Sequence, residues 1–225
     1  MNEKVGTFQK EFNEVAREGQ RFAIASRAKE FQLQACQNLD ALRLKASRLK
    51  EETIAASDED SANAMLSIEE MILGLTSELK MWIALKEDDP NRAWNDLMDA
   101  QDHTRTVMQA HAIAGHLSGY SSRLHALEVL LFPPLTFCSP GLVVKHAKCS
   151  ICEQEYGECD HVVGRPYIGK MCTAIVTEIK EFREVSLVKQ PANKRARIMS
   201  LIENGMERDI MTWRTVPAKP LTKTT

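Results

Sequence analysis

The stretch KCSICEQEYGECDH, residues 148–161, contains three cysteines and one histidine. Cys149 and Cys152 form a C-x2-C pair, a spacing that lets two thiolates reach one metal ion. Cys159 and His161 form a C-x-H pair, and residues two apart in an extended segment point to the same side. Three sulfurs and one imidazole suit a closed tetrahedral site. The spacing therefore predicts a structural Zn²⁺ ion held by Cys149, Cys152, Cys159 and His161.

Other interpretations of these cysteines remain open. Cys172 is a fifth candidate and could replace Cys159 or His161 as a ligand. A catalytic zinc keeps one position for water, and four good ligands argue against one. A redox C-x2-C pair is expected near a βαβ pattern, which this sequence lacks. The Cys-Asp-His end is similar to zinc-supported HNH nucleases, but no histidine follows His161 to act as the second metal ligand.

A longer segment, about residues 137–198, carries a family resemblance. It contains SPGLVVKHAKCSICEQEYGECDHVVGRPYIGKMC, followed by EVSLVKQPANKRARI. This pattern resembles a module of uncharacterised bacterial and phage-borne proteins. It also resembles the C-terminal part of tailed-phage prohead maturation proteases, some of which carry a similar cysteine insertion. The resemblance implies a phage or bacterial mobile-element context.

The same resemblance implies an alternative function, a serine protease with Ser139 as nucleophile. In that family the serine lies in a Ser-x-Gly-apolar strand, and a histidine comes from an earlier β-strand. Here the upstream histidines fall in a predicted helix, so Ser139 lacks an activating base. His146 follows at an odd offset, which places it on the opposite face of a strand unless a bulge intervenes. We therefore interpret Ser139 as a structural turn residue. The upstream histidines are His103, His111, His116 and His125.

Four basic residues surround the Pro191-Ala192-Asn193 turn and are candidate binding residues for phosphate or an acidic partner. A solvated loop and strand edge is the alternative that we favour. No aromatic residue interleaves with them, which argues against stacking on single-stranded nucleic acid, although a nucleic-acid partner stays open. The four residues are Lys189, Lys194, Arg195 and Arg197.

The first part of the chain is predicted to be helical. Residues 3–56 contain no proline, and apolar or small residues recur every three or four positions, which indicates one long helix with a single apolar stripe. A second helix is expected to follow Ser57 as its cap, and a third to run from Asn91 to Leu131. The expected interior residues are Phe8, Phe12, Leu39, Leu42, Ile68, Ile72 and Trp82.

After Pro134 the sequence is typical of β-structure. Short strands are predicted at residues 142–144, 173–179, 184–189, 195–202 and 208–214, with a hairpin turn at Asn204-Gly205. The expected fold class is α+β: a three-helix antiparallel hairpin or bundle, then a small zinc-stabilised β domain. The predicted domains are 1–132 (helical, coiled-coil-like) and 133–216 (zinc-binding β), with a flexible tail at 217–225.

Charge and composition exclude some classes of protein. The chain has 225 residues and a net charge of −2, so no overall field points to nucleic acid or membrane. It has no apolar stretch of membrane-spanning length and no N-terminal secretion signal, so we expect a cytoplasmic protein with reduced cysteines. Because three narrow helical stripes would not cover one another fully, we expect a homo-oligomer or complex subunit with unknown protein partners. The sequence predicts a non-catalytic interaction or assembly protein.

Overall fold

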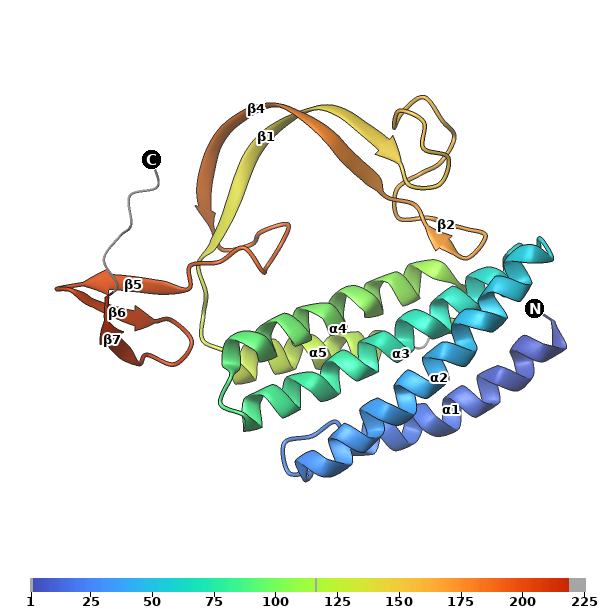
Figure 1. The fold of residues 1–225 in the computed structure, drawn as a ribbon, viewed down its shortest axis with the longest axis horizontal. Coiled ribbons are helices and arrows are strands. Elements are labelled where there is room, and N and C mark those ends of the chain that lie inside the picture. Colours follow the sequence, from blue (N-terminus) through green and yellow to red (C-terminus); the bar gives the residue numbers. More distant parts are fainter. Residues whose placement is uncertain (1, 116, 219–225) are drawn as a thin grey trace.

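The helical half is a five-helix bundle rather than the predicted three helices. The computed structural model describes residues 2–115 and 117–218. The helices pack side by side, with the β-structure above them (Figure 1). They are α1 (Glu3–Phe22), α2 (Lys29–Ala55), α3 (Glu59–Lys86), α4 (Pro90–Ala110) and α5 (Ser118–Leu131), with a 3₁₀ turn, η1 (Ala112–Ala114), between the last two.

The prediction of one helix over residues 3–56 was wrong, because the chain turns back between α1 and α2. No glycine or proline marks this turn, and long-range hydrogen bonds stabilise it instead. The Gln32 side chain donates to the carbonyls of Phe22 and Ile24, at 2.9 and 3.1 Å. The Arg123 guanidinium, from α5, donates to the carbonyl of Ala23 at 2.7 Å. These donors satisfy carbonyls that the end of a helix leaves without partners.

The predicted third helix is also broken, at residues 111–117. His111 adopts an extended backbone conformation, and its Nδ1 accepts a hydrogen bond from the backbone N–H of Ile113. Earlier in the chain, the cap of α3 is Asp58 rather than the predicted Ser57, whose φ of 55° is left-handed. Pro90 opens α4 as expected, with Asp89 as its cap.

Helix α3 lies at the centre of the bundle and is buried on most of its faces. Of the expected interior residues, Phe12 is partly buried and all the others are buried. One chain therefore covers these residues without a second copy, while Phe31, Leu44, Val129 and Leu130 of the helices are exposed. The oligomeric state stays a prediction.

One carboxylate lies fully inside the bundle. Glu78 of α3 is 0% exposed and forms an ion pair with Arg123 of α5. The Tyr120 hydroxyl donates to the same carboxylate at 2.8 Å. Burial raises the pKa of Glu78, and the Arg123 charge opposes that rise. The network joins α3 to α5, and through the Ala23 carbonyl it also reaches the end of α1.

The β half is built around a long two-stranded ribbon of β1 (Phe137–Cys149) and β4 (Ala174–Val188). The strands pair antiparallel and curve from one end of the bundle to the other (Figure 1). The segments predicted at 173–179 and 184–189 are thus one strand, and the segment at 142–144 is part of a longer one. Between β1 and β4 the chain forms the metal module, residues 150–173, which contains the hairpin of β2 (Pro166–Tyr167) and β3 (Lys170–Met171).

A separate three-stranded sheet follows, made of β5 (Ser200–Glu203), β6 (Met206–Asp209) and β7 (Thr215–Pro217). The predicted Asn204-Gly205 hairpin turn is confirmed, with φ of 53° and 76°. The strand predicted at 195–202 begins only at Ser200. Of the strand predicted at 208–214, only residues 208 and 209 are in β6, and residues 210–214 form the connection to β7. Pro217, assigned to the flexible tail, belongs to β7, while residues 219–225 lie outside the described residues.

Candidate metal centre

The structure brings the four predicted ligands together. The ligand atoms of Cys149, Cys152, Cys159 and His161 all lie within 4.8 Å of one another. A tetrahedral ion with metal–sulfur bonds of about 2.3 Å places its sulfurs about 3.8 Å apart, so the observed group has a suitable size. Cys149 is buried and the other three ligands are half-buried. This group could bind a metal ion such as zinc.

A tight turn at the end of β1 positions the first two cysteines. The Glu153 N–H donates to the Cys149 carbonyl at 2.9 Å, and the Cys149 N–H donates to the Gln154 carbonyl at 2.9 Å. Glu153 has a φ of 62°, which reverses the chain immediately after Cys152. Within this turn the Ile151 N–H points at the Cys149 sulfur, at 3.4 Å. The backbone therefore directs N–H groups at a sulfur that would bind metal.

These N–H groups change the acidity of Cys149. Burial raises its pKa, but hydrogen bonds from the Cys152 and Ile151 backbone and from neighbouring thiols outweigh that effect and lower the pKa to about 6. The thiolate form of Cys149 is therefore favoured at neutral pH even without metal. A thiolate is the form that binds zinc.

Cys172 lies beside the cluster and outside the four-ligand group. Its Sγ atom is 3.9 Å from that of Cys149, and the side chain is fully buried. Burial and the neighbouring Cys149 raise the pKa of Cys172 to about 11, so its thiol stays protonated. Cys172 stays the runner-up ligand, because its distance from the Cys149 sulfur also suits two sulfurs of one tetrahedral site.

The imidazole of His161 also has a nitrogen that a metal ion could bind. The Nδ1 atom of His161 is buried and has no hydrogen-bond partner among the described residues. A buried imidazole nitrogen without a partner is costly, and a metal ion would satisfy it. The ring packs edge-on against Tyr167, with centroids 4.7 Å apart. Tyr156 and Tyr167 accept hydrogen bonds from the backbone of Val163 and Val162, so both tyrosines support the loop that carries His161.

The metal module is attached to the bundle through the tip of its β2–β3 hairpin. The Gly169 N–H donates to the Asn63 side chain of α3 at 2.8 Å, in a buried contact. Gly169 has a φ of +73°, and a Cβ added there would lie 3.2 Å from a carbon of Ile54 and 3.4 Å from the Ala62 carbonyl. Glycine is needed here both for its backbone conformation and for its close approach to the helices.

Gly169→Ala is expected to lower the free energy of unfolding by about 2 kcal/mol, because it combines left-handed strain with crowding against α2 and α3. Gly205→Ala is the matched control, since Gly205 has a φ of +76° and open space around its Cβ position. The control should cost about 1 kcal/mol, from strain alone. Urea denaturation of both variants measures the difference, and equal losses would contradict the docking contact.

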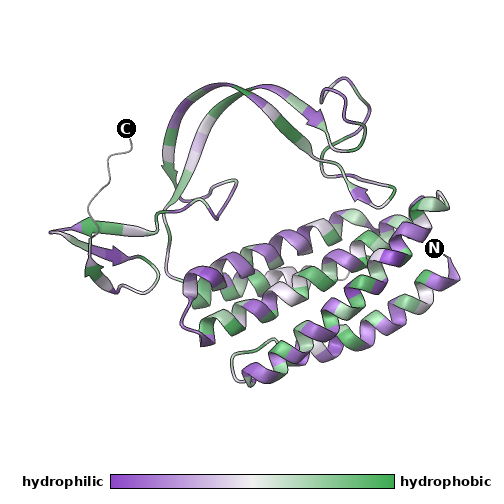
Figure 2. Ribbon diagram, viewed as in Figure 1, coloured by the Kyte–Doolittle hydropathy of each residue, from purple (hydrophilic) through white to green (hydrophobic). Residues whose placement is uncertain are grey.

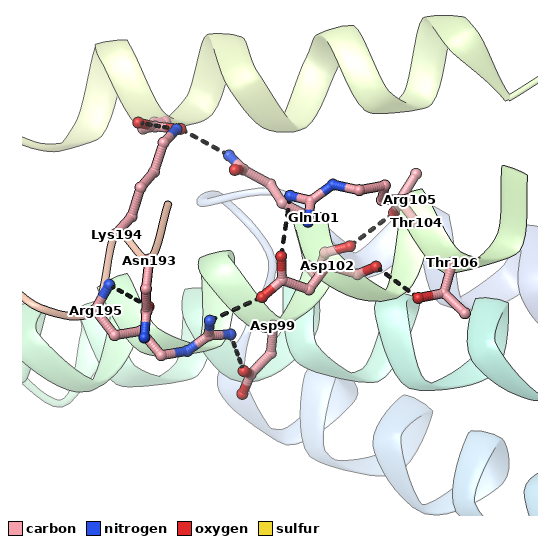
Figure 3. A network of polar contacts seen from close by, with 11 residues as sticks. Asp99, Gln101, Asp102, Thr104, Arg105, Thr106, Asn193, Lys194 and Arg195 are labelled. Carbon is pink, nitrogen blue, oxygen red and sulfur yellow. Dashed lines mark hydrogen bonds and ion pairs between the residues drawn. The ribbon is translucent and has the colours of Figure 1, made fainter. Parts of the chain in front are cut away.

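The other end of the ribbon is held against α4 and α5 by the basic residues (Figure 3). Lys194 pairs with Glu128 at 2.7 Å, and Arg195 pairs with Asp102 at 2.8 Å and also with Asp99. The close-up shows the Arg195 side chain between these two carboxylates of α4. These two candidate binding residues are therefore already neutralised by acidic groups of the same chain.

Arg197 and Lys189 occupy different surroundings. Arg197 is buried, with its guanidinium 5.6 Å above the Trp94 ring and a hydrogen bond of 2.8 Å to Asn91. The interpretation of this segment as a solvated loop was wrong at Arg197, because the side chain packs onto α4. Lys189 is exposed and lines a surface cavity together with Trp94 and Glu128. Sequence reasoning missed Trp94, whose indole N–H donates to the Lys194 carbonyl at 3.1 Å.

Ser139 lies in β1, opposite Ser186 of β4. The bulge that was allowed for between Ser139 and His146 is present, because a register shift at Lys145 returns His146 to the Ser139 side of the ribbon. The two residues are still roughly 20 Å apart along the strand. His146 instead contacts Glu155 at 3.1 Å. Among the described residues no histidine is hydrogen-bonded to the Ser139 hydroxyl.

The helix histidines do not gather into a site in the described part of the chain. His103 contacts Glu70 at 2.7 Å, and His111 contacts Asp60 at 3.1 Å. His125 Nδ1 lies 2.8 Å from the Ser121 carbonyl of its own helix. His116 lies outside the described residues. The described histidines of the helical half therefore act in separate local contacts.

None of the described helices combines the length and the apolar character that crossing a bilayer requires. No family model, no curated protein and no solved structure matches the chain. The resemblance to prohead maturation proteases therefore stays a prediction from residues 137–198. The chain is characterised by its architecture, an α-helical bundle followed by small antiparallel sheets with a Cys3His group that could bind a metal ion.

Proposed function

We propose that this chain is a non-catalytic interaction and assembly protein whose β half is stabilised by a structural zinc ion. The observation that carries the proposal is the complete Cys3His group, with ligand atoms within 4.8 Å of one another at the end of the ribbon. Four protein ligands leave no coordination position for a reactive water, so zinc here would stabilise the module without taking part in a reaction. The ion would hold together a module too small to have a large apolar core.

The location of the cluster supports this role. The module touches the bundle through the Gly169–Asn63 contact, and the far end of the ribbon is held by Arg195 and Arg197. A metal ion in the module would therefore fix the ribbon at a set position over the helices. A rigid, exposed ribbon is suited to binding another protein, and no observation favours the protease alternative.

The proposal is tested by comparing two substitutions in one cellular or binding assay. Ser139→Ala is expected to leave zinc content, soluble protein level and activity unchanged, because Ser139 has no base beside it. Cys152→Ser is expected to abolish activity through loss of zinc and of the module fold. Elemental analysis and quantified protein levels separate these causes. Loss of activity in Ser139→Ala at normal protein level, with wild-type protein labelled by a fluorophosphonate probe, would establish the protease alternative instead.

A further inference from the structure

The β1–β4 ribbon is amphipathic between Ser139 and Lys148, whereas its end pair Phe137–Val188 is apolar. Successive residue pairs of an antiparallel ribbon lie alternately on its two faces. One face carries the apolar pairs Pro140–Val185, Leu142–Phe182, Val144–Ile179 and Ala147–Val176. The alternate pairs carry serine or a charged or titratable group, as in Ser139–Ser186, Val143–Glu181 and His146–Glu178. The ribbon therefore has one apolar face without charge and one polar face.

Register shifts maintain this separation. The pairing skips Arg183, Lys180, Lys145 and Thr177, and each skipped residue is polar or charged. A slip of one residue moves every following side chain to the other face. Without the shift at Arg183, this arginine would take the place that Phe182 now occupies on the apolar face. The four irregularities thus keep polar residues off one continuous apolar surface.

That surface is not covered by the described part of the chain. Six of its side chains are between 42% and 59% exposed: Leu142, Val144, Val176, Ile179, Phe182 and Val185. In Figure 2 hydrophobic and hydrophilic segments alternate along the ribbon, as expected when one face is apolar and the other polar. Contiguous exposed apolar patches of this size mark interaction sites.

The absence of charge on the apolar face suits contact with the same face of a second copy of this chain. A two-fold dimer contact needs a patch that complements itself, and a face without charge meets this condition without any repulsion. Pairing by strand addition is disfavoured, because bulges and the charged residues Lys145, Lys180 and Arg183 interrupt the strand edges. Specific protein contacts bury at least about 1,000 Å² in total, so a contact of this kind would have to cover the face along its length. Face-to-face packing of two sheets is a standard way to bury such surfaces.

We propose that the apolar face of the β1–β4 ribbon binds a second copy of this chain, face to face, to form a two-fold dimer. The inference rests on the proposed function in one respect, since it takes the metal-stabilised ribbon as the binding surface. It assigns the self-association to the ribbon and not to the helical stripes.

Sedimentation of the wild-type 225-residue chain and two lysine variants over a range of micromolar concentrations tests the dimer. Phe182→Lys places a charge on the apolar face, and Glu181→Lys places the same residue on the polar face one position away. The wild type and Glu181→Lys are expected at twice the chain mass of 25.4 kDa. Phe182→Lys is expected at the single-chain mass. Because Phe182 is 59% exposed, its replacement should leave circular dichroism and zinc content unchanged.

Zinc content measured on the same samples separates failure of this inference from failure of the proposed function. A wild-type monomer with one zinc per chain overturns the dimer and leaves the zinc-stabilised module intact. A wild-type dimer without zinc supports the ribbon contact and contradicts the structural zinc. A dimer that persists in Phe182→Lys overturns the assignment of the contact to this face.

Discussion

Cys149→Ser is expected to reduce bound zinc from one ion per chain to nearly none and to unfold residues 150–173, while α1 to α5 remain helical. Cys149 is the buried ligand whose thiolate is favoured by backbone N–H groups. Structural zinc sites in small domains contribute about 10–16 kcal/mol to folding, more than this module can lose and stay ordered. Elemental analysis measures the bound zinc, and hydrogen exchange measures separately whether residues 150–173 are folded.

Two further serine variants serve as controls. Cys138→Ser changes the same strand outside the ligand group and should keep the zinc. Cys172→Ser replaces the buried neighbour of Cys149 and should also keep the zinc, because Cys172 lies outside the four-ligand group. Zinc loss in Cys172→Ser with zinc retained in Cys159→Ser would make Cys172 the fourth ligand in place of Cys159.

Arg123→Met is expected to lower the free energy of unfolding by about 3 kcal/mol at neutral pH, because it leaves the Glu78 carboxylate buried without its cation. The value is taken from the lower end of the range for buried pairs, since the Arg123 side chain is 37% exposed. Arg105→Met is the matched control. Arg105 pairs with Asp102 at the surface, where such a pair contributes less than about 1 kcal/mol.

The pH dependence of the loss identifies Glu78 as its cause. Burial raises the folded-state pKa of Glu78, so the stability that its protonation contributes is present at low pH and is lost as the pH rises through that pKa. Removing Arg123 raises the pKa further. The deficit of Arg123→Met should therefore be smaller at about pH 5 than at about pH 8. Glu78→Gln in the same chain should recover part of the lost stability, and a pH-independent deficit without recovery would contradict this explanation.

The ligand set could be predicted from the sequence because its information is local. C-x2-C and C-x-H spacings decide which sulfurs and imidazole can converge, and the turn between them is short. The same holds for the Asn204-Gly205 turn, whose two residues tolerate a positive φ. The order of helices followed by strands also follows from local periodicity, so the α+β class was predictable while the number of helices was not.

The features that the sequence did not reveal depend on distant partners. The chain turns after α1 because Gln32 and Arg123 satisfy its last carbonyls, and neither residue is a recognised helix stop signal. The Asn63–Gly169 contact joins residues 106 positions apart. The long β4 strand was read as two because bulges at Arg183 and Lys180 interrupt its alternation. No local pattern around Gly169 reveals the helices against which this glycine packs.

The ribbon held at both ends has a consequence for how it opens. A two-stranded ribbon by itself is marginally stable and normally unzips from a free end. Here Phe137 packs on Trp94 at one end, and the metal module closes the other. With both ends closed, strand separation has to start in the middle, where bulges already interrupt the pairing. If the proposed zinc ion is bound, its release would loosen the connection of residues 150–173 and let the strands separate from that end as well, so metal occupancy would set the lifetime of the ribbon as well as its stability.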